Sequence, residues 1–345
     1  MEQTLSLAAK TLTSPVVLCF ALGLVVALIR SGIAFPKVVS NVLGLYLLFA
    51  IGFKGGAGVA EHGADATLAI GLVTGALLSL CIPLLAFFLL QRFTGLDRTD
   101  AAAVSAHYGS ISIVTFTAAI ALLGVMGTAY EGWMVAVAAV MEAPAILTAL
   151  VLARGGLFAA QAVSVAGGTM VAGGQGPSFN PSALYGPLRE AVLNKAFVVL
   201  MSAFALGWFA GPQGLANAEP LLIWPFQVLL CVFLLDMGLA AGRGLKASAR
   251  DLTPPLLAFG IVMPLIGAGL GLTAGALIGL SEGGTALLGV LAASASYIAA
   301  PAAMRAALPE ARPEIYLTLS LGITFPFNLL LGIPLYISIA GWLVG

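Results

Sequence analysis

The chain has 345 residues, of which 61% are hydrophobic and only 8% are charged, and its mean hydropathy is +1.09. A soluble globular domain carries about 25% charged residues, so most of this chain must lie in lipid rather than in water. The formal net charge is zero at pH 7, which argues against a protein that binds nucleic acid, since such a protein needs basic residues to neutralise phosphates.

Ten apolar stretches long enough to cross a bilayer follow one another along the chain. A transmembrane helix needs about 20 apolar residues, so the expected fold class is an all-α polytopic membrane protein with ten transmembrane helices. The N-terminal segment lacks a basic region and a clear cleavage site, so we expect the first stretch to be retained as a helix. The ten stretches are 14–31, 37–58, 66–92, 100–124, 130–153, 186–210, 219–242, 253–280, 284–306 and 315–343.

One connection is much longer than the others. Residues 154–185 lie between the fifth and sixth stretches and are rich in Gly, Ser and Pro, a composition typical of flexible linkers. The sequence therefore predicts an N-terminal five-helix unit over 1–153, a linker over 154–185 and a C-terminal five-helix unit over 186–345.

The basic residues predict the orientation of the helices. Lys and Arg favour the cytoplasmic side of a membrane. With ten helices, all of the 14 Lys and Arg residues except Lys10 and Lys54 fall on the side of the linker. We therefore expect a cytoplasmic linker, a location in the cytoplasmic (inner) membrane, and both termini on the outer or periplasmic side.

Three pairs of short segments indicate an internal repeat. AIGFKGGAG (50–58) corresponds to LLDMGLAAG (234–242), GSIS (109–112) to ASAS (293–296), and MEAPA (141–145) to TFPFN (324–328). The separations are all about 182–184 residues, and the order is the same. Because each unit has an odd number of helices, the two units insert in opposite orientations, as in inverted-repeat secondary transporters.

Small polar residues interrupt the fourth and ninth stretches, where such transporters unwind their helices near the bilayer midplane to bind substrate. Half-helix N–H groups and hydroxyls suit a small anion. No Lys or Arg lies beside either interruption, so N–H dipoles rather than a full positive charge would meet the anion, and binding would be weak and reversible. Close helix packing is the alternative explanation for such residues. Pro301 would help to keep the ninth helix open. The candidate substrate-binding residues are Gly109, Ser110, Ser112, Thr115, Ser294 and Ser296.

Other polar residues at membrane depth are candidates for ion coupling, because such residues are costly in hydrocarbon. Glu142 and Asn328 are candidate cation ligands, although Glu142 can equally cap a broken helix. His107 either contacts substrate or is a packed core residue. Lys54 and Asp236 would form an ion pair or act as separate interface anchors.

Catalytic signatures are missing from the sequence. There is no HExxH motif, no Cys/His cluster and no pair of intramembrane aspartates, so we expect a protein that is not an enzyme and has no cofactor apart from a coupling ion. A purely structural or sensory membrane protein is a further alternative at this point.

Six segments between Ser14 and Tyr336 carry a resemblance to a known family. They are SPVVLCFALG, NVLGLYLLFAIGFKGG, YEGWMVAVAAVMEAPAILTA, LDMGLA, LAASASYIAAPAAMRAALPEA and ITFPFNLLLGIPLY. Together they resemble the SbtA-type sodium-dependent bicarbonate transporters, as a permease of a non-cyanobacterial branch.

The resemblance implies two inverted five-helix repeats. It implies a gate domain of helices 1, 2, 6 and 7, and a core domain of helices 3–5 and 8–10, in which helices 4 and 9 are broken and cross at the midplane. It also implies elevator-type movement, a homotrimer, sodium–bicarbonate symport and a PII-like cytoplasmic regulator that acts at the linker. Ser112, Thr115, Ser294 and Ser296 match the family's hydroxyls, and Glu142 matches an acid that precedes a proline.

One candidate residue departs from the family pattern. Cyanobacterial members carry an aspartate where this chain has Tyr297, and that carboxylate is a natural sodium or substrate ligand. The alternative on the same scaffold is therefore a sodium- or proton-coupled carrier of another small, organic anion.

Overall fold

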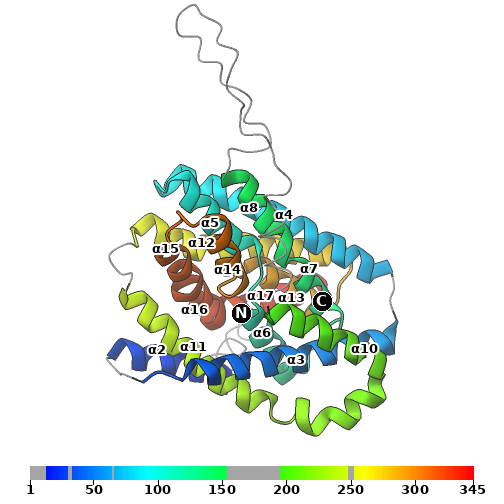
Figure 1. Ribbon diagram of the computed structural model, residues 1–345. Coiled ribbons are helices and arrows are strands. Elements are labelled where there is room, and N and C mark those ends of the chain that lie inside the picture. The colour runs from blue at the N-terminus through cyan, green and yellow to red at the C-terminus, as the bar shows by residue number, and fades with distance from the viewer. Residues whose placement is uncertain (1–12, 30–32, 64–65, 154–194, 248–251) are drawn as a thin grey trace, which may run out of the picture.

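The computed structural model describes residues 13–29, 33–63, 66–153, 195–247 and 252–345 (Figure 1). These residues form helices and contain no strand. The expected linker over 154–185 lies outside the described residues, and so does the expected regulator site on it.

The helices follow one another with short connections. In chain order they are α2 (Pro15–Ile29), α3 (Lys37–His62), α4 (Ala66–Phe93), α5 (Arg98–Gly109), α6 (Ile113–Met126), α7 (Met134–Val140), α8 (Glu142–Ala153), α10 (Lys195–Leu222), α11 (Phe226–Ala247), α12 (Pro254–Leu277), α13 (Glu282–Ala293), α14 (Ala299–Ala307), α15 (Pro313–Leu317), the π-helix η1 (Thr318–Thr324), α16 (Phe325–Phe327), the π-helix η2 (Asn328–Gly332) and α17 (Ile333–Val344).

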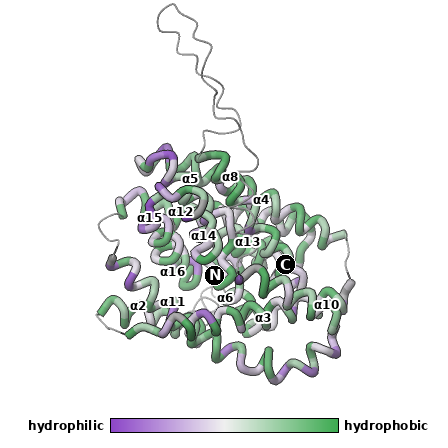
Figure 2. Tube along the Cα trace, viewed as in Figure 1, coloured by the Kyte–Doolittle hydropathy of each residue, from purple (hydrophilic) through white to green (hydrophobic). Residues whose placement is uncertain are grey.

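The described residues include eight segments that are long and apolar enough to cross a membrane, by length and composition. The pairs α5–α6 and α7–α8 each count as one such segment, and so does the run from α15 to α17. Two shorter apolar helices, α2 and α13, accompany them. Figure 2 shows that the helices are hydrophobic along most of their length. The prediction of an all-α, multi-pass membrane protein is confirmed.

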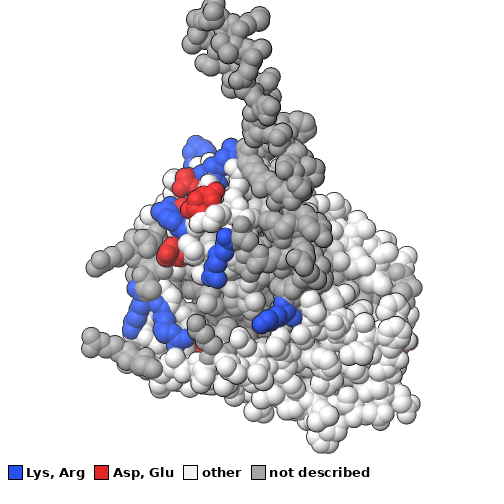
Figure 3. All heavy atoms as spheres, in the orientation of Figure 1, with Lys and Arg blue, Asp and Glu red and all other residues white. Residues whose placement is uncertain are grey.

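In Figure 3 charged side chains gather over the left and centre of the face shown, and the described residues over its right half carry almost none. An uncharged surface of this extent is what lipid requires, since a charged side chain at the bilayer centre costs several kcal/mol.

One group of helices, here called the first helix group, consists of α2, α3, α10 and α11. In it α2 packs along α11, and α3 packs along α10. Glycines permit these close approaches: a Cβ on Gly56 would lie 1.9 Å from the Phe204 carbonyl oxygen, and one on Gly207 would lie 2.0 Å from the Phe53 carbonyl oxygen. The stripe of small residues in α3 is therefore a packing surface for α10.

The remaining helices form the second helix group, in which α5 packs against α4 and α8, while α13 packs against α12 and α17. Both α5 and α13 have 12 residues, and each end of α13 follows the matching end of α5 by 184 residues. Their N-caps match as well: the Asp97 side chain accepts from the Asp100 N–H, and the Ser281 side chain accepts from the Gly284 N–H. The two helices are therefore built alike at both ends.

Polar contacts fix the N-terminus of each of these helices to a distant loop. The buried Asp100 carboxylate forms an ion pair with Arg312, whose N–H and Nε lie 2.8 and 2.6 Å from its oxygens. At α13 the Glu131 carboxylate accepts from the Ser281 N–H at 2.7 Å and from its hydroxyl at 3.0 Å. These contacts set the positions of α5 and α13, whose C-terminal ends meet at the site described next.

Candidate functional site

The chain leaves the helical conformation at the C-terminal ends of α5 and α13. Ser110 has φ −89° and ψ 145°, and Ser294 has φ −81° and ψ 158°, both extended. Extended residues break the helical hydrogen-bond ladder and leave backbone groups without intrahelical partners. Ser112 begins the next helix as the N-cap of α6, where its Oγ accepts from the Thr115 N–H at 3.2 Å.

The two interruptions bond to each other reciprocally. The Ser112 N–H donates to Ser294 Oγ at 2.9 Å, and the Ser296 N–H donates to the His107 carbonyl oxygen at 2.7 Å. Ser296 Oγ in turn accepts from the N–H of Ala300 in α14 at 3.2 Å. Each interruption therefore satisfies part of the exposed backbone of the other.

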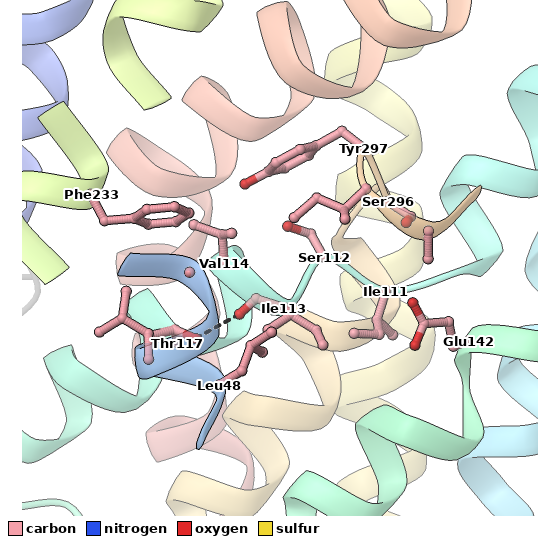
Figure 4. A pocket seen from close by; sticks show the side chains of 14 residues that line it. Leu48, Ile111, Ser112, Ile113, Val114, Thr117, Glu142, Phe233, Ser296 and Tyr297 are labelled. Carbon is pink, nitrogen blue, oxygen red and sulfur yellow. Dashed lines mark hydrogen bonds between the residues drawn. The ribbon is translucent and has the colours of Figure 1, made fainter. Parts of the chain in front are cut away.

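A small cavity of about 40 Å³ lies beside this crossing. Figure 4 shows the hydroxyls of Ser112 and Tyr297 directed toward the same space, with Phe233 at its edge. The cavity is lined by Ile111, Ser112, Ile113, Val114 and Thr117 from the first interruption and α6, Glu142 from α8, Ser296, Tyr297, Ile298 and Ala299 from the second interruption and α14, Gly44, Leu47 and Leu48 from α3, and Phe233 from α11.

The polar groups of the cavity are few. Glu142 is 3% exposed, and no Lys or Arg lines the cavity. The Tyr297 hydroxyl is buried and has no hydrogen-bond partner within the part of the chain that the structure describes. Hydroxyls in a mostly apolar, buried space offer strong polar contacts to a small ion, because water does not screen them.

A family model described as the Na⁺-dependent bicarbonate transporter superfamily matches residues 15–341. The chain belongs to this superfamily. No curated protein matches the chain. This family agrees with the resemblance found in the sequence, and it is a family of transporters, not of enzymes. Within the described residues, no group of three His, Cys, Asp or Glu side chains could hold a metal ion. For a transporter of this superfamily, the expected ions are sodium and bicarbonate.

Four of the predicted site residues lie next to the transporter's cavity rather than on its lining. Thr115 Oγ1 donates to Ser112 Oγ at 2.9 Å, and Ser294 holds the Ser112 N–H, so both position Ser112. Ser110 is fully buried, and its hydroxyl has no partner in the described part of the chain. A Cβ on Gly109 would lie 2.2 Å from Pro83 Cγ, so this glycine lets α4 approach α5.

Three other candidates also lie off the lining. His107 is fully buried, its Nδ1 lies 2.6 Å from the Ala103 carbonyl oxygen, and its ring stacks on Tyr316 at 4.5 Å between centroids. Asn328 Nδ2 donates to the Ala293 carbonyl oxygen at 2.8 Å, and Tyr336 donates to Asn328 Oδ1 at 3.0 Å. Pro301 is buried within the first turn of α14. Their functional roles stay predictions.

Part of the lining was not singled out from the sequence. Leu47 and Leu48 of α3 and Phe233 of α11 are apolar residues within apolar helices, so nothing marks them in the sequence. Thr117 is a hydroxyl residue five positions after Ser112, and its proximity to GSIS is a signal that would have found it.

The two remaining charged candidates do not meet. Asp236 of α11 accepts a hydrogen bond from the Ser40 hydroxyl, near the N-terminus of α3. Lys54 lies 14 residues further along α3, and its Nζ is 5.9 Å from the centroid of the Tyr130 ring. Of the two alternatives, an ion pair between Lys54 and Asp236 is wrong.

Proposed function

We propose that this transporter is a symporter that couples sodium to the movement of bicarbonate, and that the anion binds in the cavity between Ser112 and Ser296. The observation that carries the proposal is the placement of these two hydroxyl residues, one from each interruption, on one small buried cavity that also receives a carboxylate. Hydroxyl donors that converge without a fixed positive charge suit weak, reversible binding of an anion.

The size of the cavity supports bicarbonate over a larger organic anion. A water molecule needs roughly 10–15 Å³ of such volume, so the cavity of about 40 Å³ has room for about three or four waters or for one ion of a few atoms. A carrier of organic carboxylates would need space for the carbon chain as well. That carrier remains the second candidate, because Tyr297 stands where cyanobacterial family members have an acid.

Glu142 supports coupling to a cation. Its buried carboxylate lines the same cavity as the proposed anion. Two unit charges of the same sign about 5 Å apart repel by roughly 3 kcal/mol at an effective dielectric constant of 20. A sodium ion between the carboxylate and the anion would replace this repulsion with two attractions, so the anion and the cation would favour each other's binding.

The architecture we propose has ten transmembrane helices in two inverted repeats, over 1–153 and 186–345. Broken helices 4 and 9 would be α5–α6 and α13–α14. The common separation of 184 residues between α5 and α13 supports the repeat. Within the described residues, each of the ten predicted stretches overlaps one of the eight candidate spans, α2 or the pair α13–α14.

We also propose elevator movement of the second helix group, as core domain, against the first helix group, as gate domain. The polar part of the cavity comes from the second group, whereas α3 and α11 contribute only glycine, leucine and phenylalanine. A bound ion would then move with the second group along an apolar wall. A homotrimer, a location in the inner membrane with both termini outside, and a PII-like regulator complete the proposal, on the strength of the family resemblance and of the basic residues.

Uptake into proteoliposomes tests the function. Labelled bicarbonate would be added under an inward sodium gradient, under an equal potassium gradient, and to protein-free liposomes that report carbon dioxide permeation. We expect sodium-driven uptake above both controls. Uptake indifferent to sodium would refute symport. Competition by formate, acetate and lactate separates the two candidates, since a carrier of organic anions would transport the competitor and leave bicarbonate a weak ligand.

A further inference from the structure

A second and much larger cavity, of about 590 Å³, lies between the two helix groups. We call it the vestibule. Its walls are α3, the C-terminal half of α6, the loop 127–132, the start of α7, and the facing parts of α10 and α11. Among the residues that line it, only Lys54 and Glu61 carry a charge, and both belong to α3.

The vestibule continues the line of the small cavity. On α3 the small cavity ends at Leu48 and the vestibule begins at Ala50, and on α6 the corresponding residues are Thr117 and Ile120. Two to three residues correspond to about 3–4.5 Å along a helix, so one layer of side chains separates the two spaces. Leu48, Ile51 and Ile120 are each at most 6% exposed. The vestibule is therefore an approach to the site, closed by an apolar layer.

Lys54 is well placed to act on an ion in this approach. It lies six residues beyond Leu48, or about 9 Å along the helix, and its Nζ forms no ion pair with any residue that the structure describes. The ammonium lies over the ring of Tyr130, which is neutral because a phenol hydroxyl ionises only near pH 10. Glu61 is a further seven residues, about 10 Å, toward the end of the helix.

We propose that Lys54 makes the vestibule an anion-collecting site, which concentrates small monovalent anions in front of the buried cavity. The inference rests on the proposed function for the identity of the anion, which would be bicarbonate, but the electrostatic effect of Lys54 does not depend on transport. A fixed cation in a cavity with apolar walls raises the local concentration of anions and their rate of arrival. The apolar layer then prevents this strong charge from holding the anion within the site.

The potential in the vestibule can be measured directly with charged thiol reagents. A single cysteine would be introduced as Gln227→Cys, on the α11 wall, after Cys19, Cys81 and Cys231 are replaced by alanine. The readout is the ratio of the reaction rates of an anionic and a cationic methanethiosulfonate. A unit charge about 10 Å away in water changes this ratio about fourfold. We expect Lys54→Gln to lower the ratio by about that factor, and Lys54→Arg to preserve it.

Two further variants serve as matched controls. Glu61→Gln removes the opposite charge from the same wall, so it should raise the ratio. Arg92→Gln removes an exposed cation in the last turn of α4. Arg92 does not line the vestibule, so this substitution should leave the ratio unchanged. An unchanged ratio in Lys54→Gln would overturn the proposal, and so would an equal fall in Arg92→Gln.

The functional consequence is an effect on KM without an effect on the maximal rate. Lys54→Gln should raise the KM for bicarbonate about twofold at low ionic strength, and high salt should remove the difference, because salt screens charges beyond about 10 Å. A fall in the maximal rate with an unchanged KM would count against the proposal. Should the wild-type protein take up no bicarbonate, the proposed function fails, while the thiol-reagent ratio still decides whether Lys54 attracts anions.

Discussion

The bond between the two interruptions gives the most direct test of the site. Ser294→Ala removes the oxygen that accepts the Ser112 N–H at 2.9 Å and donates to the Leu291 carbonyl at 2.9 Å. The Leu291 carbonyl keeps the Ser294 N–H as a partner at 3.2 Å, whereas the buried Ser112 N–H loses the acceptor. An unsatisfied buried donor costs about 1–3 kcal/mol, so we expect destabilisation of that size and loss of uptake.

The control for this variant is Ser105→Ala. Ser105 is also fully buried. Its hydroxyl donates to the Ala102 carbonyl within the same helix, at 2.7 Å, and accepts no hydrogen bond across the crossing. The same atom is removed and no N–H is left unsatisfied, so the loss of stability should be smaller. Thermal unfolding in detergent compares the two variants, and uptake is measured in parallel. A Ser294→Ala protein as stable and as active as Ser105→Ala would refute the reasoning.

Three further predictions concern charge and hydroxyls. The double substitution Ser112→Ala with Ser296→Ala should abolish bicarbonate uptake, while size-exclusion chromatography shows a folded protein; normal uptake would remove these residues from the site. Glu142→Gln should lower the apparent affinity for sodium at least tenfold in uptake assays, because the amide keeps the shape and loses the charge; an unchanged sodium dependence would show that the cation binds elsewhere. Arg312→Gln should lower the unfolding temperature, by the equivalent of about 1 kcal/mol, since the half-exposed guanidinium is partly screened, and the buried Asp100 keeps the Arg312 N–H as a partner; Arg92→Gln is the matched exposed control.

Much of the fold was predictable because lipid imposes a simple rule on the sequence. Each spanning helix must be a long apolar run, and the predicted stretch 66–92 differs by one residue from α4 (Ala66–Phe93). The predicted end of the stretch 186–210 falls at a real break, because Gly211 is non-helical, with φ 62° and ψ −168°. The prediction left out the helical part of α10 that follows this kink and continues to Leu222.

The site was predictable only where its residues are unusual for their surroundings. Ser112, Ser296 and Glu142 are polar residues in apolar runs, and all three line the cavity. The same signal also selects polar residues with a structural contact: Asn328 caps the end of α13 through the Ala293 carbonyl. An apolar run does not reveal which leucine faces a cavity, so Leu48 could not be found without the packing of α3.

Tyr297 shows how one position changes the balance of charge at such a site. An aspartate there would add a second carboxylate beside Glu142, and each buried carboxylate requires a cation or a proton for its compensation. The tyrosine instead brings a neutral hydroxyl that Figure 4 shows directed toward the cavity, and this hydroxyl has no partner in the described residues. A hydroxyl donates to an anion that a carboxylate would repel. If the anion binds here as we propose, we expect a site with Tyr297 to need fewer sodium ions than a site with an aspartate at this position.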